Sequence, residues 1–285
     1  MLPELARRAI SAYSDPGDLV VDPMCGIGTT LVEAIHLGRN ALGVERERRW
    51  ASLATANLAH AREQGAASRA AVIEGDARQL PRLLTRAGRT WLDRGAERSS
   101  QGTVARLGAG SADLILTSPP YGRDIELIDK PAWIADGSLG DKASRNYSAG
   151  RGNLGHARGG RYQAAMGEVY AACAAALKPG GFLVVVTKNL RAGRALHDLG
   201  GVTVGLCQAT GLQYWQHVIA LHAAVRDDHL APRPSFWQLS TIRTALARGE
   251  RIQLVCHEDV LVFHKPEAAE AAGARSAAAT TRAAA

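Results

Sequence analysis

The sequence lacks any uninterrupted apolar run of roughly 18 residues, which is the length that a membrane-spanning helix requires. Its N-terminus also lacks the charged, apolar and cleavable pattern of a secretory signal. These two absences count against a membrane-anchored or exported protein. We therefore expect a cytoplasmic protein.

Cysteine is scarce, and its placement excludes two further classes of protein. The four cysteines, Cys25, Cys173, Cys207 and Cys256, are scattered singly, with no Cys-x-x-Cys pair and no metal-ligand spacing to histidine. We expect them to be small buried side chains. The sequence therefore predicts neither a disulfide framework nor a metal site.

The charge balance is basic. Lysine and arginine number 34 against 27 acidic residues, which gives a net charge of +7, and the isoelectric point is near 9.5. Such a balance suits an anionic partner such as a nucleic acid, although many basic proteins bind none. The length of 285 residues is enough for one sizeable core, and we favour a single domain.

The most informative stretch is Thr-Ser-Pro-Pro-Tyr at 117–121, which follows the apolar run 112–116 and so ends a buried parallel strand. Two successive prolines give no N–H to a sheet and fix φ, so the chain leaves the sheet extended and stiff. Ligands of open α/β sheets bind beyond the carboxyl ends of the strands. This turn therefore offers Ser118, a carbonyl and the Tyr121 ring to a site, unless it is an ordinary strand-ending turn with a packed tyrosine.

A second strand-then-loop pattern lies at 19–30, Leu-Val-Val-Asp-Pro-Met-Cys-Gly-Ile-Gly-Thr-Thr. Gly26 and Gly28 allow a tight turn and a close approach of the backbone to a ligand, and Thr29 or Thr30 can cap the following helix. The pattern lacks the third glycine of a dinucleotide fingerprint and the Gly-Lys-Ser/Thr of a nucleotide triphosphate loop. The leading candidate for a cofactor is therefore S-adenosylmethionine.

Together, the two stretches resemble the amino-group DNA methyltransferases, specifically the subgroup with Ser-Pro-Pro-Tyr. The resemblance implies an α/β, Rossmann-like class I methyltransferase fold, with a seven-stranded, mostly parallel sheet and helices on both faces. It implies DNA as the partner and S-adenosylmethionine as the cofactor. The cofactor would be held by residues of the glycine-containing stretch, namely Asp22, Pro23, Cys25, Gly26, Gly28, Thr29 and Thr30.

Two further predicted strands end in acidic residues. Glu45 ends the run 41–45, and a carboxylate about twenty residues past the glycine turn can accept hydrogen bonds from both ribose hydroxyls. Asp76, with Ala77 beside it, ends the run 71–77 and matches the family position that binds the adenine amine. Either acid can instead cap the helix that follows it.

The implied reaction is methyl transfer to an exocyclic amine, which is a poor nucleophile because its lone pair is delocalised into the base. Catalysis then requires acceptors that hold the amine N–H groups. The resemblance assigns this role to Ser118 Oγ and the Pro119 carbonyl, with Pro120 completing the stiff turn. Tyr121 would stack on a base that has left the duplex. In the family that the sequence resembles, serine at the first position of this motif is commonest among enzymes that methylate cytosine N4, so the resemblance implies cytosine N4 as the target, with adenine N6 as the alternative.

A basic, glycine-rich insertion is predicted at about 122–161. Its part from 142 to 161 holds five basic residues, five glycines and no acid. Such a segment can follow a phosphate backbone and order on binding, or it can be a solvated loop. We expect one methyltransferase domain over 1–266, a disordered alanine-rich tail over 267–285, and association with the nucleoid.

The remaining elements are predicted from periodicity and from Pro and Gly signals. The helix 47–64 should turn Trp50, Leu53, Ala54 and Leu58 inward, and a Pro-containing turn is expected at 233–237. Further helices are predicted at 2–13, 31–37, 162–177, 197–211 and about 241–247, and further strands at 182–187, 214–223 and 260–264.

The alternative functions are a carbon-5 cytosine methylase, an RNA methyltransferase, a small-molecule methylase and a catalytically silent relative. A carbon-5 cytosine methylase needs a cysteine nucleophile, usually after proline, and the sequence has no Pro-Cys dipeptide. An RNA guanine-amine methyltransferase has a related Pro-Pro-Tyr turn but generally carries an RNA-binding domain ahead of the catalytic one. A catalytically silent nucleic-acid-binding relative would be supported by an altered glycine turn or a missing Tyr121, and neither is found.

Overall fold

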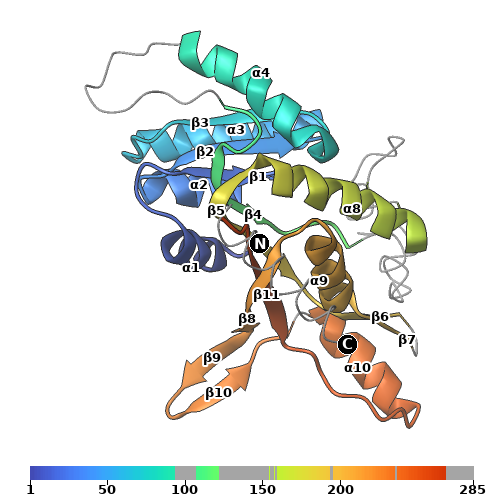
Figure 1. Ribbon diagram of the computed structural model, residues 1–285. Coiled ribbons are helices and arrows are strands. Elements are labelled where there is room, and N and C mark those ends of the chain that lie inside the picture. Colours follow the sequence, from blue (N-terminus) through green and yellow to red (C-terminus); the bar gives the residue numbers. More distant parts are fainter. Residues whose placement is uncertain are drawn as a thin grey trace, which may run out of the picture.

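The structure, a computed structural model, describes residues 1–93, 107–121, 154, 157, 159–192, 195–234 and 236–267 (Figure 1). Residues 122–153 of the predicted insertion and the predicted tail from 268 onward lie outside this part of the chain. The assignment of 1–266 to one domain stays a prediction. In the described ranges no helix has the length and apolarity needed to cross a membrane.

The centre of the fold is a seven-stranded sheet in the order β3-β2-β1-β4-β5-β11-β8. The first five strands in this order pair in parallel, whereas β11 pairs antiparallel with both β5 and β8. The strands are β1 (Leu19–Asp22), β2 (Asn40–Glu45), β3 (Ala70–Glu74), β4 (Ala112–Thr117), β5 (Leu177–Thr187), β8 (Gln213–Leu221) and β11 (His257–His264). This topology confirms the predicted mostly parallel sheet.

Helices cover both faces of the sheet, as predicted (Figure 1). Successive residues of β1 point to opposite faces, so that Val20 belongs to one core cluster and Val21 to the other. The helices are α1 (Pro3–Tyr13), α2 (Thr29–His36), α3 (Arg48–Glu63), α4 (Leu80–Asp93), α8 (Gly159–Ala176), α9 (Leu199–Ala209) and α10 (Phe236–Ala247), with a 3-10 turn η1 (Ala77–Gln79) before α4. Helices α1 to α3 pack on the Val20 face, and α4, α8 and α9 pack on the Val21 face.

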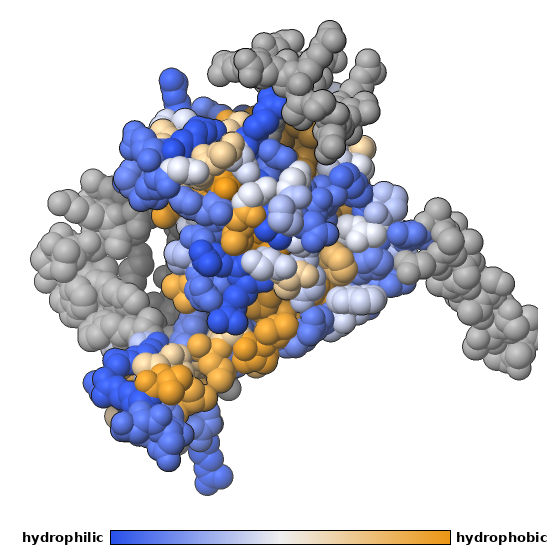
Figure 2. All heavy atoms as spheres, turned by 90° about the vertical axis from the view of Figure 1, so that its left-hand side faces the viewer, coloured by the Kyte–Doolittle hydropathy of each residue, from blue (hydrophilic) through white to orange (hydrophobic). Residues whose placement is uncertain are grey.

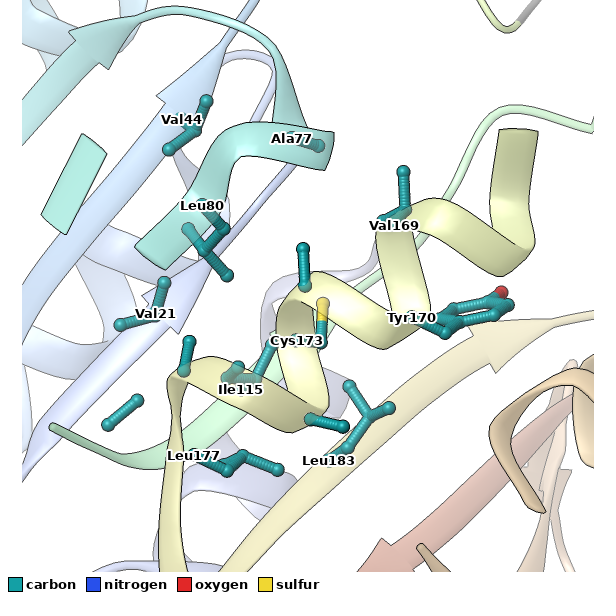
Figure 3. Close-up of a cluster of buried hydrophobic side chains, with 14 of the residues drawn as sticks. Val21, Val44, Ala77, Leu80, Ile115, Val169, Tyr170, Cys173, Leu177 and Leu183 are labelled. Atoms are coloured by element: carbon teal, nitrogen blue, oxygen red, sulfur yellow. The ribbon is translucent and has the colours of Figure 1, made fainter. Parts of the chain in front are cut away.

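The core on the Val21 face is organised by α8, which lies across the central strands (Figure 3). Val169, Tyr170 and Cys173 of this helix are at most 1% exposed and belong to one cluster with Ile115 of β4 and Leu183 of β5. Burial of each aliphatic side chain in this cluster, such as Val169, Ile115 or Leu183, contributes about 1.5 to 3 kcal/mol. The position of α8 relative to the end of β4 is therefore fixed by the core.

Some predicted boundaries were wrong. Strand β5 begins at Leu177 rather than 182, because the Pro-Gly segment stays hydrogen-bonded to Lys265 through Gly180 and Gly181. The helix over 241–247 begins earlier, at Phe236, inside the predicted turn. Two hairpins were not predicted, β6 (Leu190–Ala192) with β7 (Ala195–His197) and β9 (Ala223–Arg226) with β10 (His229–Pro232).

The predicted inner face of α3 was partly wrong. Ala54 and Leu58 are buried as expected, but Leu53 is 42% exposed and Trp50 is half-buried. The buried positions are Ala51, Ala54, Leu58 and Ala61, which keep helical spacing. Three of these four positions are alanines, so small side chains make up most of the face that packs against the sheet.

The edge of the sheet at β8 is apolar and exposed. Trp215, Val218, Ile219 and Leu221 of this strand are between 41% and 59% exposed. Figure 2 shows an apolar band in the lower half of the molecule, at the height where Figure 1 places β8 and the β9–β10 hairpin.

Candidate active site

The predicted site residues gather beyond one end of the strands, because the carboxyl ends of parallel strands lie together. Asp22 ends β1 and Glu45 ends β2, while Asp76 follows β3 by two residues. Ser118 directly follows β4, which is the neighbour of β1. The two motifs, separated by almost ninety residues in the sequence, thus emerge from adjacent strands.

The glycine turn joins β1 to α2 with two left-handed backbone positions, φ +53° at Gly26 and φ +85° at Gly28. Gly28 is also the N-cap residue of α2, and an added Cβ there would lie 3.1 Å from the Cβ of Ala54 in α3. Thr29 and Thr30 lie inside the helix, and no side chain caps it. The prediction of a threonine cap was therefore wrong, since Gly28 takes that position.

Asp22 is the buried centre of this turn, with an exposed fraction of 3%. Its carboxylate accepts hydrogen bonds from Thr30 Oγ1 at 2.7 Å and from the Met24 N–H at 3.1 Å. Burial raises the pKa of Asp22 to about 6, against the lowering effect of these hydrogen bonds. The carboxylate therefore holds the turn and the first residues of α2 to the end of β1.

Pro23, Cys25 and Ala77 are buried, and their side chains belong to the scaffold rather than to an open surface. A Cβ added at Gly43 in β2 would come within 2.6 Å of Cys25 Sγ. The Cys25 N–H also donates to the Val44 carbonyl at 3.0 Å. Cys25 therefore holds the glycine turn against β2, and burial raises the pKa of its thiol.

Glu45 connects the end of β2 to the glycine turn. Its Oε2 accepts from the Gly26 N–H at 2.9 Å, and its Oε1 accepts from the Glu47 N–H at 2.8 Å. Burial raises the pKa of this carboxyl. The Arg46 N–H also contributes a hydrogen bond to this carboxylate. Because a carboxylate can accept about four hydrogen bonds, Glu45 keeps capacity for a further donor.

Asp76 caps the 3-10 turn η1, which is the alternative that the sequence left open. Its Oδ1 accepts from the Arg78 N–H at 3.1 Å and from Arg78 Nε at 2.9 Å. Its Oδ2 accepts from Arg78 Nη2 at 2.6 Å and from Arg46 Nη1 at 2.7 Å. The hydrogen bonds from Arg78 hold the pKa of Asp76 below its usual value. Neither arginine was predicted from the sequence to belong to the site, although Arg46 directly follows Glu45.

The Ser-Pro-Pro-Tyr turn lies at the end of β4 with Pro119 buried and its other residues half-buried. Tyr162 of α8 donates a hydrogen bond from its hydroxyl to the Pro120 carbonyl at 2.7 Å. Lys188, which directly follows β5, places its Nζ 5.7 Å from the centre of the Tyr121 ring. Neither Tyr162 nor Lys188 was predicted from the sequence to contact this turn. The position of Lys188 at the tip of the strand beside β4 was the available signal.

Comparison with known proteins supports the predicted family for the first part of the chain. Residues 3–56 match a family model described as DNA methylase, of the N6 and N4 type. Over 50 residues the chain is 46% identical to the Type II methyltransferase M.MthZI of Methanothermobacter thermautotrophicus, covering 18% of this chain and 14% of that protein. Over 54 residues it is 43% identical to the Type II methyltransferase M.HinfI of Haemophilus influenzae, covering 19% of this chain and 15% of that protein. The chain thus matches about one seventh of each relative's length, and the resemblance to amino-group DNA methylases is confirmed over this segment.

A solved structure shares the fold over a longer span. The crystal structure of the cyclase SpnF has a TM-score of 0.50 and 14% sequence identity, and it covers 93% of this chain and 82% of that chain. At this identity the likeness concerns the fold alone.

The buried Asp22 carboxylate predicts a pH-dependent stability. Its pKa is raised from 3.8 to about 6, so the folded state binds the proton more tightly than the unfolded state does. This contribution is complete below about pH 4 and is lost as the pH rises to about 6. Relative to Asp22→Asn, the free energy of unfolding of the wild type should fall by about 3 kcal/mol across this window.

Urea unfolding at several pH values measures this difference. The control is Asp228→Asn, because the Asp228 side chain is fully exposed. Its free energy of unfolding should follow the same pH course as that of the wild type. Parallel stability curves for the wild type and Asp22→Asn between pH 4 and 6 would contradict the assignment.

Proposed function

We propose that this protein transfers a methyl group from S-adenosylmethionine to an exocyclic amino group of a DNA base, with cytosine N4 as the preferred target. The observation that carries the proposal is the placement of the two motifs. The glycine turn after β1 and the Ser-Pro-Pro-Tyr turn after β4 lie on adjacent strands of the sheet. The first of these turns lies within the segment that matches DNA methylases.

The residues of the glycine turn fit S-adenosylmethionine, which supplies the methyl group when it is bound. A Cβ added at Gly26 would meet no other atom within 4 Å, so the backbone here borders open space. Glu45 keeps acceptor capacity for a ribose hydroxyl. The buried hydroxyl of Thr117 lies near Asp22. Among the described residues it makes no hydrogen bond within 3.5 Å.

The role proposed for Asp76 requires a rearrangement. Four donors already occupy its two oxygens, which fills the usual capacity of a carboxylate. An adenine amine can therefore bind Asp76 only by displacing one of them. Arg46 is the donor that we expect to give way, because its side chain is 39% exposed and makes a single contact to this carboxylate, whereas Arg78 makes three.

The Ser-Pro-Pro-Tyr turn supplies the acceptors for the amine. We assign one N–H to Ser118 Oγ and the other to the Pro119 carbonyl, which would localise the nitrogen lone pair toward the methyl group. Tyr121 is the stacking surface for a base that has left the duplex. We assign no contact with the amine to Pro120, whose carbonyl already accepts a hydrogen bond from the Tyr162 hydroxyl.

The choice between cytosine N4 and adenine N6 rests on serine at position 118, and adenine N6 is the second candidate because the matching family model covers both amines. DNA is preferred over RNA because the two curated relatives are Type II methyltransferases and the model describes a DNA methylase. A catalytically silent protein is disfavoured because both turns keep the residues that the chemistry needs.

The cofactor assignment predicts a loss of affinity in Glu45→Ala. Removing a charged acceptor that faces two hydroxyls should weaken S-adenosylmethionine binding by about 1.5 to 3 kcal/mol, as measured by calorimetry. Glu74→Ala is the matched control, since Glu74 ends the neighbouring strand β3 and is exposed. Equal affinities in Glu45→Ala and the wild type would contradict the ribose role.

The acceptor assignment predicts a slower chemical step in Ser118→Ala. The substitution removes one hydrogen bond that strengthens as the amine becomes tetrahedral, so single-turnover methyl transfer to DNA should fall by about tenfold with cofactor affinity unchanged. Ser52→Ala on the exposed face of α3 serves as the control. An unimpaired rate would remove Ser118 from the mechanism. Transfer to DNA whose target base lacks the amine would overturn amino-group methylation itself.

A further inference from the structure

The Ser-Pro-Pro-Tyr turn is held by a residue that no sequence motif identifies. The Tyr162 hydroxyl donates to the Pro120 carbonyl at 2.7 Å, across 42 residues of sequence. Tyr162 lies in the first turn of α8, and its ring packs against the core on the Val21 face. The contact therefore ties the turn to a helix whose own position is fixed by buried side chains.

This hydrogen bond restrains a rotation that the prolines leave free. A proline ring fixes φ but not ψ, and ψ at Pro120 sets the direction of its carbonyl oxygen. Binding of that oxygen by Tyr162 fixes the peptide plane between Pro120 and Tyr121.

The same contact supports different roles for the carbonyls of Pro119 and Pro120. The Pro120 oxygen is engaged by Tyr162, whereas Pro119 lies nearer to Ser118 in the turn. Burial raises the pKa of Tyr162 to about 12, so the phenol stays protonated and remains a donor at neutral pH. Lys188 near the Tyr121 ring gives the turn a second contact from another element.

We propose that Tyr162 is a positioning residue for methyl transfer, which fixes the Pro120 carbonyl so that Ser118 Oγ and the Pro119 carbonyl face the amine. The inference rests on the proposed function and goes beyond it, because Tyr162 touches neither the cofactor nor the amine in this mechanism. Its hydroxyl acts through the turn. Its effect should therefore be confined to the rate of the chemical step.

Tyr162→Phe tests this role, because it removes the hydroxyl and keeps the ring that packs against the core. We expect kcat for methyl transfer to DNA to fall about tenfold, with KM for DNA and the Kd of S-adenosylmethionine within twofold of the wild type. The matched control is Tyr170→Phe, which changes a buried tyrosine two turns along α8, and it should keep the wild-type kcat. An unchanged kcat in Tyr162→Phe overturns the proposal. A fall in kcat with an equal loss of cofactor affinity also overturns it, since that result indicates a general structural role.

A second measurement reports the contact without activity. In protein labelled with carbon-13 at the carbonyls of its 11 prolines, Tyr162→Phe should shift one carbonyl resonance that Tyr170→Phe leaves in place. No shifted resonance would contradict the hydrogen bond. If the wild type transferred no methyl group to DNA, the proposed function would fail and the positioning role with it. A transferring wild type with an unaffected Tyr162→Phe variant would reject the positioning role alone.

Discussion

The site depends on one buried carboxylate. Asp22 lies at the end of β1, where Thr30 of α2 and the Met24 N–H both donate to it. Burial of a charge is unfavourable, as the raised pKa shows, and the carboxylate keeps it only because these donors converge. This arrangement fixes the start of α2 without a side-chain cap. It also holds the backbone of Gly26 next to open space beyond the carboxyl ends of the strands.

The two halves of the site are held by different means. The glycine turn is held locally, by Asp22 within the turn and by Glu45 on the neighbouring strand. The Ser-Pro-Pro-Tyr turn is held from a distance, by Tyr162 of α8, which is over forty residues away in sequence. Since β1 and β4 are adjacent, both turns meet at the same edge, where a methyl donor and an acceptor amine would have to meet.

Much of this architecture was predictable, because strand runs and glycine turns are local signals. The strand ends at Asp22, Glu45 and Thr117 lie where the apolar runs predict them. The contacts of long sequence separation were not predictable. Nothing local indicates that Tyr162 reaches Pro120. The prediction of a threonine cap was wrong because a left-handed glycine can occupy the N-cap position. The Thr30 hydroxyl instead donates to Asp22.

The most direct test of the central claim uses S-adenosylmethionine with a deuterated methyl group and bacterial DNA amplified in vitro, which carries no methylation. After incubation with the protein, the DNA is digested to nucleosides and analysed by mass spectrometry. The account predicts the deuterated methyl group on an exocyclic amine, chiefly as N4-methylcytosine. Label on carbon 5 of cytosine, or label in RNA alone in a parallel reaction, would contradict it.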